Sequence, residues 1–304
     1  MAAQREPLAG GRWHFSHGPI DIVIGADGEP AAVLAAHEAA WSRFQPLLQE
    51  LVDELPQLRR PIAGLCRLQG VVAQRMWSAC LPFSKSYITP MAAVAGSVAQ
   101  ELIGAYRRSG VRRAWVNNGG DIALHLAPGE SARVGLVTDL AAFDTAALRR
   151  AAAGRLQPDG QFELRAEDGV RGVATSGWRG RSFSLGIADS VTVLAATAAM
   201  ADAAATAVAN AVDVDWPGIE RLPANLLRDD SDLGAIPVTT SVPLLPPALA
   251  REALQRGSAR AHELQARGLI VAAVLVCQGQ ASFVQAPALL PVLAPFLLEA
   301  TTAP

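Results

Sequence analysis

The chain has 304 residues, of which 51% are hydrophobic and 18% are charged, and its formal net charge is -2. This is the composition of a globular chain, long enough to bury a sizeable core in one large domain or two smaller ones. Acidic and basic residues nearly cancel and no basic run stands out, which argues against a nucleic-acid partner bound through a positive surface.

Cysteines and apolar segments give no sign of secretion or of a membrane anchor. The three cysteines, Cys66, Cys80 and Cys277, are far apart and form neither a disulfide framework nor a CxxC metal pattern. The N-terminal residues lack the apolar stretch of a signal peptide. The most apolar long segment, 193–212, has Asp202 at its centre, which makes membrane insertion costly. We therefore expect a cytoplasmic protein with no membrane partner.

The first third of the chain is predicted to hold a strand and two helices. Residues 18–28 alternate between apolar and polar side chains and end in a glycine turn, as a strand does. From residue 30 to 55 apolar side chains recur every three or four positions, which predicts a helix with His37 as a core residue in its apolar stripe. A second helix is predicted over 89–110, with Thr89 as its N-cap.

The middle of the chain is predicted to be mainly strands. Segments 112–116, 121–126 and 132–137 are predicted to form an antiparallel meander, and 161–174 a further strand pair. Residues 139–160 are predicted to connect them. Strands and helices do not alternate strictly, so we expect an α+β fold with mainly antiparallel sheets flanked by helices, in a single domain over 1–304.

The last third begins with a strand, "SVTVLAA", that runs into a long alanine-rich helix ending near Asp213. Residues 214–247 are predicted to be irregular, 247–267 a helix, and 269–285 a hairpin. The apolar tail "LLPVLAPFLLEA" is either a packed terminal helix, which we expect, or a dimer contact. The sequence therefore leaves a homodimer open.

Polar residues form one line along the alanine-rich helix. Asp202, Thr206 and Asn210 recur every four residues and so share a face. Such a line can simply face water. The alternative is a ligand site: a carboxylate and a hydroxyl one turn apart offer two hard oxygens, which suit Mg²⁺ or Ca²⁺.

Two glycine-containing segments could approach a ligand. The stretch "VNNGGDIALHL" places two asparagines, two glycines and an aspartate between apolar strands, which is typical of a hairpin turn but also lets the main chain come close to a ligand. "GVATSGWRG" offers hydroxyls and N–H groups at the end of a strand. The GxGxxG, P-loop and GxSxG motifs are absent, which disfavours dinucleotide folds, P-loop folds and triad hydrolysis.

The order of these pieces resembles the ApbE-like superfamily of FAD:protein FMN transferases. "NNGGDI", then "ATSG", then "SVTV" running into "ADAAAT" carry the resemblance, which extends from about Ile88 to Asn210. The longer strings "VNNGGDIALHL" and "ATSGWRGRSFSLGIADSVTV" resemble most closely a UPF branch of that superfamily. The resemblance implies an ApbE-like fold and a site for a flavin nucleotide.

The resemblance also assigns residues to that site. It implies that Asp202 and Thr206 hold Mg²⁺, and that the cofactor, FAD or an FMN-like ligand, lies against the two glycine-containing segments. The implied cofactor-binding residues are Asn117, Asn118, Gly119, Gly120, Asp121, Thr175, Ser176 and Gly177.

Departures from the transferase pattern bear on the reaction. Transferases carry a His and an Asp-Pro-x-Thr-Gly loop where this chain has "SLGIADSVTV", and Lys-Gly where it has Ala95-Gly96. The activating groups left near the motifs are Asp121 and Asp189, the two catalytic candidates. Two functions follow: a Mg²⁺-dependent transferase related to FAD:protein FMN transferase, or a non-catalytic cofactor-binding or pterin-related protein linked to tetrahydromethanopterin one-carbon metabolism. Either takes a small nucleotide-like or pterin-like ligand.

Overall fold

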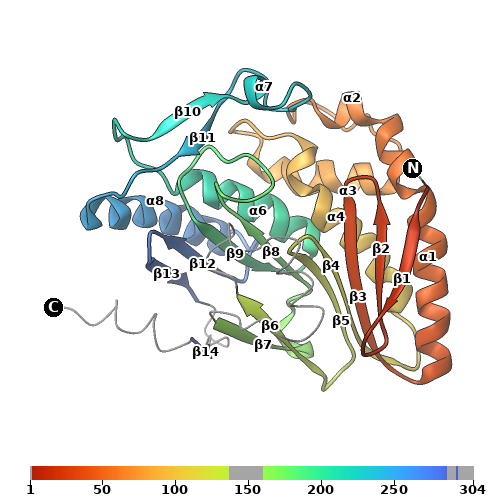
Figure 1. Ribbon diagram of the computed structural model, residues 1–304. Coiled ribbons are helices and arrows are strands. Elements are labelled where there is room, and N and C mark those ends of the chain that lie inside the picture. Colours follow the sequence, from red (N-terminus) through yellow and green to blue (C-terminus); the bar gives the residue numbers. More distant parts are fainter. Residues whose placement is uncertain (1, 137–159, 286–291, 294–304) are drawn as a thin grey trace. The chain divides into compact units, whose positions relative to one another are not determined.

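The computed structural model describes residues 2–136, 160–285 and 292–293 (Figure 1). The chain divides into two compact units, each with helices and strands, so the expected α+β class is confirmed. The first unit comprises Met1–Ala132, Leu164–Ala174 and Leu194–Ala203, and the second Arg133–Glu163, Thr175–Val193 and Ala204–Pro304. That the whole chain folds as one domain stays a prediction.

The first unit is built on an antiparallel sheet with strand order β1-β2-β3-β4-β5-β8. The strands are β1 (Gln4–Leu8), β2 (Arg12–His17), β3 (Ile20–Gly28), β4 (Val111–Asn118), β5 (Asp121–Leu126) and β8 (Gly172–Ser176). The expected strand over 18–28 is confirmed as β3. The hairpin of β1 and β2 was not predicted, and it turns through Gly10 and Gly11, whose φ angles are 75° and 70°.

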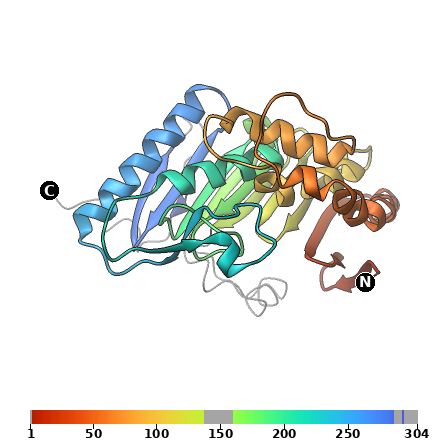
Figure 2. The ribbon, with the colours of Figure 1, turned by 90° about the horizontal axis from the view of Figure 1, so that it is seen from above.

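Helices cover the strands of the first unit. They are α1 (Pro30–Asp53), α2 (Leu55–Leu58), α3 (Val71–Cys80) and α4 (Val94–Ile103), with short 3₁₀ turns at Leu81–Phe83, Pro90–Ala93 and Gly104–Tyr106. Helix α1 packs against β2 and β3, and α4 against β4 and β5 (Figure 2). Thr89 caps the Pro90–Ala93 turn, which leads into α4, since its hydroxyl accepts a hydrogen bond from Met91 N at 3.2 Å.

His37 lies in the core of the first unit, as expected. Its side chain is buried, and its Nδ1 lies 2.7 Å from the hydroxyl of Tyr106, which is also buried. Burial lowers the pKa of His37, although the nearby Glu38 opposes the shift. The Nε2 atom has no hydrogen-bond partner within the described part of the chain. Only one end of this core histidine is therefore satisfied.

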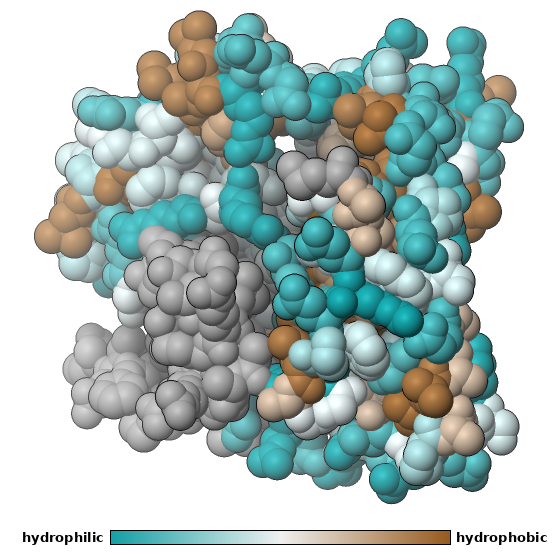
Figure 3. Space-filling view, turned by 45° about the vertical axis from the view of Figure 1, so that its right-hand side comes forward, coloured by the Kyte–Doolittle hydropathy of each residue, from teal (hydrophilic) through white to brown (hydrophobic). Residues whose placement is uncertain are grey.

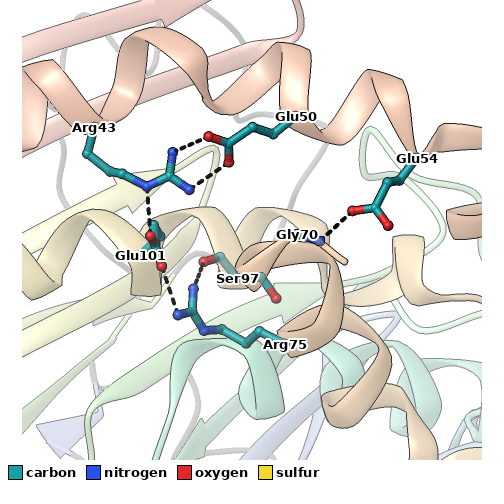
Figure 4. A network of polar contacts seen from close by, with 7 residues as sticks. All are labelled: Arg43, Glu50, Glu54, Gly70, Arg75, Ser97 and Glu101. Carbon is teal, nitrogen blue, oxygen red and sulfur yellow. Dashed lines mark hydrogen bonds and ion pairs between the residues drawn. The ribbon is translucent and has the colours of Figure 1, made fainter. Parts of the chain in front are cut away.

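A network of ion pairs joins three helices of the first unit (Figure 4). Glu101 of α4 accepts from Arg43 of α1 at 2.7 Å and pairs with Arg75 of α3 at 2.8 Å. Arg43 also binds both carboxylate oxygens of Glu50, at 2.9 and 2.7 Å. Arg75 donates to the carbonyl of Ser97 at 3.1 Å. The network fixes α4 against α1 and α3.

The second unit combines strands with one long helix. Its strand order is β8-β9-β12-β13, with β9 at Ser190–Ala195, β12 at Ala272–Cys277 and β13 at Gln280–Val284. Helix α8 (Pro247–Ala266) packs against β12 and β13, which pair antiparallel as the expected hairpin. Helix α6 (Ala198–Ala211), the expected alanine-rich helix, has its first residues in the first unit and the rest in the second.

Three expectations about strands were wrong. Strand β6 (Ser131–Leu136) does not continue a meander from β5, because β6 pairs in a separate sheet of order β14-β7-β6 while β5 pairs with β8. For the same reason β7 (Gly160–Arg165) and β8 are not a strand pair. Residues 214–247 are not wholly irregular, since they include β10 (Glu220–Pro223), α7 (Ala224–Leu227) and β11 (Pro237–Ser241). The small sheet also includes β14 (Val292–Leu293).

Some expectations fall on residues that the structure leaves undescribed. The connection over 139–160 lies almost entirely outside the described residues, and so does most of the apolar C-terminal tail. Among the described helices, none combines the length and apolar character needed to cross a membrane. On the face drawn in Figure 3, the described hydrophobic residues form separate groups between hydrophilic ones.

Candidate functional site

Asp202 lies near the start of helix α6, in the first unit, and contacts helix α4. Its Oδ2 accepts a hydrogen bond from the main-chain N–H of Gly96 at 2.8 Å. The beginning of α6 is fixed by two further bonds: Thr197 Oγ1 accepts from Met200 N at 3.3 Å, and Gln100 Oε1 accepts from Ala199 N at 3.1 Å. The carboxylate of Asp202 is therefore held by main chain rather than left to water.

Glycine at position 96 is what allows the two helices to meet. A Cβ atom there would lie 2.3 Å from the carbonyl oxygen of Ala198 and 2.9 Å from the Cβ of Asp202. Such distances are shorter than van der Waals contact, so no larger residue fits without moving a helix. The Ala95-Gly96 pair, where transferases have Lys-Gly, thus sits directly against the carboxylate of Asp202.

The "NNGGD" stretch is the turn of the β4–β5 hairpin. Gly119 and Gly120 have φ angles of 66° and 115°, which other residues rarely adopt. Asn117 Oδ1 accepts from Gly120 N at 2.8 Å, and Asn118 Nδ2 donates to the carbonyl of Ala95 at 3.2 Å. The asparagines therefore stabilise the turn and join it to helix α4. The hairpin interpretation is confirmed.

The turn brings a second carboxylate close to Asp202. Asp121 begins β5, opposite Asn118 in the hairpin register. Burial raises the pKa of Asp202 well above its ordinary 3.8, and the negative charge of Asp121 raises it further, while the N–H groups of Gly96 and Ala95 oppose the shift. Two half-buried carboxylates thus repel each other at the end of the hairpin. A bound cation would relieve that repulsion.

The oxygen atoms near Asp202 suit Mg²⁺ better than a metal ion whose ligands all come from protein side chains. No group of three or more His, Cys, Asp or Glu side chains in the described segments could hold a metal ion. Mg²⁺ is often held by one or two carboxylates, with water and substrate phosphates completing its coordination. Asp202 and Asp121 offer such a pair, and Thr206 lies one turn after Asp202 on α6. The residues fit the ion.

The second glycine-containing segment lies at the end of β8, in the second unit. Thr175 Oγ1 lies 2.9 Å from Thr192 Oγ1 on β9, and Ser176 is half-buried. Gly177 is buried, and a Cβ atom there would lie 2.4 Å from the carbonyl oxygen of Asp189. Because these residues belong to the other unit, their convergence with Gly119, Gly120 and Asp202 on one site stays a prediction.

Asn210, the third polar residue of the predicted line on α6, has a structural contact. Its Oδ1 accepts from Leu185 N at 2.9 Å and from Ser184 Oγ at 3.2 Å. The side chain therefore fixes the loop that leads to β9 instead of facing water. The solvated-helix interpretation thus does not describe Asn210.

Asp189, one of the two catalytic candidates, is buried and engaged in the second unit. Its Oδ2 accepts from the main-chain N–H of Gln278, and its Oδ1 lies 3.8 Å from Arg179 Nε. Gln278 has a φ of 48°, the one positive value outside glycine within the described residues. Burial and the charge of Asp189 raise the pKa of the neighbouring Cys277 to about 12. Asp189 therefore stabilises the strained β12–β13 turn.

We expect Asp189→Ala to lower the free energy of unfolding by about 1–3 kcal/mol, because it leaves the buried N–H of Gln278 without its acceptor. Asp189→Asn keeps an acceptor oxygen and should lose less than half as much. Urea denaturation of both variants measures this. Equal losses for the two variants would show that charge, not the hydrogen bond, matters at this position.

Two features of the site were missed or underused in the sequence. The contact of Gly96 with Asp202 joins distant residues, and its only local signal is a glycine inside a helix of small residues. The pairs Arg107-Arg108 and Arg112-Arg113 flank the turn at Gly110, although no long basic run exists. Both signals depend on where the chain turns, which local pattern alone does not give.

A protein-family profile described as "AbpE bacteria" matches residues 5–283. The chain belongs to this family. It is also similar to UPF0280 proteins of several organisms. The one from Methanopyrus kandleri is 34% identical over 200 residues, which cover 65% of this chain and 72% of the relative. The one from Methanospirillum hungatei is 33% identical over 220 residues, covering 71% and 81%.

These matches confirm the expected membership of a UPF branch of the ApbE-like superfamily. Among solved structures, the apo form of the Pseudomonas stutzeri flavinyl transferase ApbE is similar with a TM-score of 0.43 and 13% identity. The alignment covers 99% of this chain and 97% of that one. The assignment of site residues of this AbpE-family chain to a ligand stays a prediction.

Proposed function

We propose that the turn over 117–121 and Asp202 form a Mg²⁺-assisted binding site for a flavin nucleotide, FAD or FMN, or for a similar phosphate-bearing heterocycle. One observation carries the proposal: Asp202 accepts from Gly96 N while the charge of Asp121 acts on it, at the end of a glycine turn. A Cβ atom at Gly120 would have no neighbour within 4 Å among the described atoms. A ligand can therefore approach the main chain of the turn.

Each group has a part in this proposal. Asp202 and the hydroxyl of Thr206 would hold Mg²⁺, which neutralises phosphate charge when bound. Asp121 would add a second carboxylate to the metal or accept a proton from a nucleophile. Thr175, Ser176 and Gly177 would supply hydroxyl and N–H groups to the ligand. The glycines and asparagines of the 117–121 turn would line its flat heterocycle.

Binding without efficient transfer is what we expect of this chain. Transfer of FMN to a protein hydroxyl needs that hydroxyl to be activated. The transferase His loop is absent here, and Asp189, one of the two remaining candidates, is occupied by the β12–β13 turn. Asp121 is the other candidate. If it suffices, the chain is a divergent Mg²⁺-dependent transferase.

A pterin-related ligand is the second candidate. The similar UPF0280 proteins come from Methanopyrus and Methanospirillum. The family resemblance links this branch to tetrahydromethanopterin one-carbon metabolism, so a methanopterin is the pterin to consider. Such a ligand also combines a fused heterocycle with phosphate, so the same carboxylates and glycine turn would serve. Binding of a tetrahydropterin therefore belongs in the test.

We expect calorimetric titration of the full chain with FAD, FMN and a tetrahydropterin to show binding by at least one of them that requires Mg²⁺. Asp202→Asn, which keeps size and one acceptor oxygen, should weaken that binding at least tenfold, about 1.4 kcal/mol, because a metal ligand loses its charge. Asp53→Asn, at an exposed position of α1, is the matched control. Thermal unfolding by circular dichroism establishes that each variant is folded.

Two results would decide against parts of the proposal. An Asp202→Asn variant with unchanged Mg²⁺-dependent affinity would contradict the proposed metal site.

Transfer of FMN is measured with FAD, Mg²⁺ and an acceptor peptide by in-gel flavin fluorescence. A strong fluorescent acceptor band that disappears in Asp202→Ala would show that the missing His loop is dispensable and that the protein is a transferase.

A further inference from the structure

A cavity lies at the end of the β4–β5 hairpin that is far from the "NNGGD" turn, within the first unit. It has a volume of about 940 Å³ and includes Val111, where β4 begins, and Leu126, where β5 ends. The "NNGGD" turn is at the opposite end of both strands. At ~3.3 Å per residue, the length of β4 separates the cavity from that turn by roughly 23 Å. The cavity is thus distinct from the proposed flavin site.

Positive charge dominates this cavity. Its lining includes Arg107, Arg108, Arg112 and Arg171, together with His125, and the one carboxylate among its lining residues is Glu29. The whole chain has a formal net charge of -2, so this concentration of arginine is local. The arginines come from three places in the chain: the turn after α4, the start of β4 and the segment before β8. The fold therefore gathers them at one opening.

Two of the arginines are available to a ligand. Arg107 is exposed and forms no ion pair with any residue that the structure describes. Arg112 reaches the carboxylate of Glu130 only at 3.6 Å, and its side chain is 65% exposed. An ion pair this long and exposed contributes little to stability, so another anion can easily replace the carboxylate of Glu130.

The other two arginines are held in place by main chain. Arg108 Nε donates to the carbonyl of Ala105 at 2.8 Å. Arg171 donates to the carbonyls of Val170 and Ala166, at 2.8 and 2.9 Å. These bonds orient the guanidinium groups without neutralising their charge. Arg171 therefore brings a fixed positive charge to the cavity.

The positive charges of the cavity also act on His125, which is half-buried in its lining. Burial lowers the pKa of His125 first, and the positive charges of Arg107 and Arg171 lower it further, although the hydrogen bond to the Val111 carbonyl opposes the shift. The arginines thus act on the interior of the cavity, not only on the solvent outside. An anion placed there would meet a favourable field.

We infer that this cavity binds a small anion with two or more phosphate groups, independently of the site at Asp202. Guanidinium groups are planar forks that bind phosphate oxygens in pairs, and they stay charged at any physiological pH. Several of them around one cavity can contact two phosphates at once. The volume is that of a site for a small molecule rather than for a folded partner. Free pyrophosphate and a nucleoside diphosphate share the chemistry that would be recognised.

Titration of the full chain with inorganic pyrophosphate, in EDTA to silence a Mg²⁺ site, tests the inference. The variant is Arg107→Gln combined with Arg112→Gln, since neither guanidinium group donates to main chain within the described segments. We expect its dissociation constant for pyrophosphate to rise at least tenfold. Arg60→Gln, at an exposed position of the same unit outside the cavity lining, should leave the constant unchanged.

A second measurement locates the ligand: NMR follows the imidazole protons of His125, which lies in the cavity lining. The chain has five histidines, and His125→Gln assigns the signal. Pyrophosphate should move that signal in the wild type and much less in the double variant. ADP is titrated in parallel. If ADP binds more tightly than pyrophosphate, the cavity recognises a nucleotide. If ADP binds equally or more weakly, the cavity recognises the free anion.

Three outcomes would overturn the inference. The double variant could bind pyrophosphate as the wild type does, or Arg60→Gln could weaken binding equally, which would indicate diffuse charge attraction. A glutamate-rich peptide that binds the cavity more tightly than pyrophosphate would indicate a protein partner. Asp202→Asn should leave pyrophosphate binding in EDTA unchanged, so failure of this site and failure of the flavin proposal are distinguishable.

Discussion

Replacement of Gly96 by alanine should lower the free energy of unfolding by about 3 kcal/mol, at the upper end of the usual cost of overpacking. The new methyl group would lie 2.3 Å from the carbonyl oxygen of Ala198, and that oxygen belongs to main chain, which cannot rotate away. Helices α4 and α6 would have to separate. Their separation would stretch the bond between Gly96 N and Asp202 Oδ2, so the same change should weaken Mg²⁺-dependent ligand binding.

Gly104→Ala is the matched control for this prediction. Gly104 follows α4, has ordinary helical φ and ψ of -55° and -34°, and a Cβ atom there would have no neighbour within 4 Å among the described atoms. Alanine at such a position should leave the free energy of unfolding unchanged or raise it by up to about 1 kcal/mol. Urea denaturation of the two variants measures the difference. Similar stability for both would contradict the close approach of α4 and α6.

The local pattern of apolar and polar residues was enough to predict the elements whose packing partners are close in the sequence. The alternation of residues 18–28 predicted β3, the spacing of apolar residues predicted α1, and the Asn-Gly turn predicted the β4–β5 hairpin. The place of β6 could not be predicted in this way. Three strands in succession favour a meander, but β5 pairs instead with β8, about fifty positions later in the chain. Such a choice depends on packing between distant segments, not on local alternation.

The candidate site shows the same limit. A single acid on an alanine-rich helix singled out Asp202, since burying an aspartate needs a partner. Its contact with Gly96 could not be predicted, because a glycine inside a helix carries no local mark of where it lies relative to α6, and only the family resemblance placed Asp121 at the same site. The arginines of the cavity at the other end of the hairpin were overlooked for a related reason. The chain's charges balance as a whole, and only the fold brings Arg171 beside the turn at Gly110.

Glu101→Gln should lower the free energy of unfolding by about 2 kcal/mol at neutral pH, because Glu101 holds two arginines from different helices. Its side chain is 16% exposed, and those of Arg43 and Arg75 are 28% and 22% exposed, so water screens the pairs only partly. Glutamine keeps the shape but removes the charge. Arg43 keeps Glu50 and Arg75 keeps the Ser97 carbonyl, which limits the loss. The helices of Figure 4 should remain folded but less firmly joined.

The pH dependence of stability distinguishes this role from simple packing. Burial alone would raise the pKa of Glu101, but the hydrogen bonds and charges of Arg43 and Arg75 outweigh it and hold the pKa below its ordinary 4.5. The folded state therefore binds this proton less readily than the unfolded chain. The stabilisation is fully present above pH 4.5 and is lost as the pH falls through the folded pKa. Glu101→Gln should lose that part of the acid dependence.

Urea denaturation at pH 7 and at several values below pH 4.5 measures the effect. Glu252→Gln is the control, because its pair with Arg256 on α8 is exposed at both ends, 47% and 55%, and such pairs contribute about 0.5 kcal/mol or less. The wild type and Glu101→Gln should converge in stability as the solution becomes more acidic. A difference between them that stays constant down to the lowest pH would mean that Glu101 acts through its shape, and that the network of Figure 4 stabilises the fold without its charge.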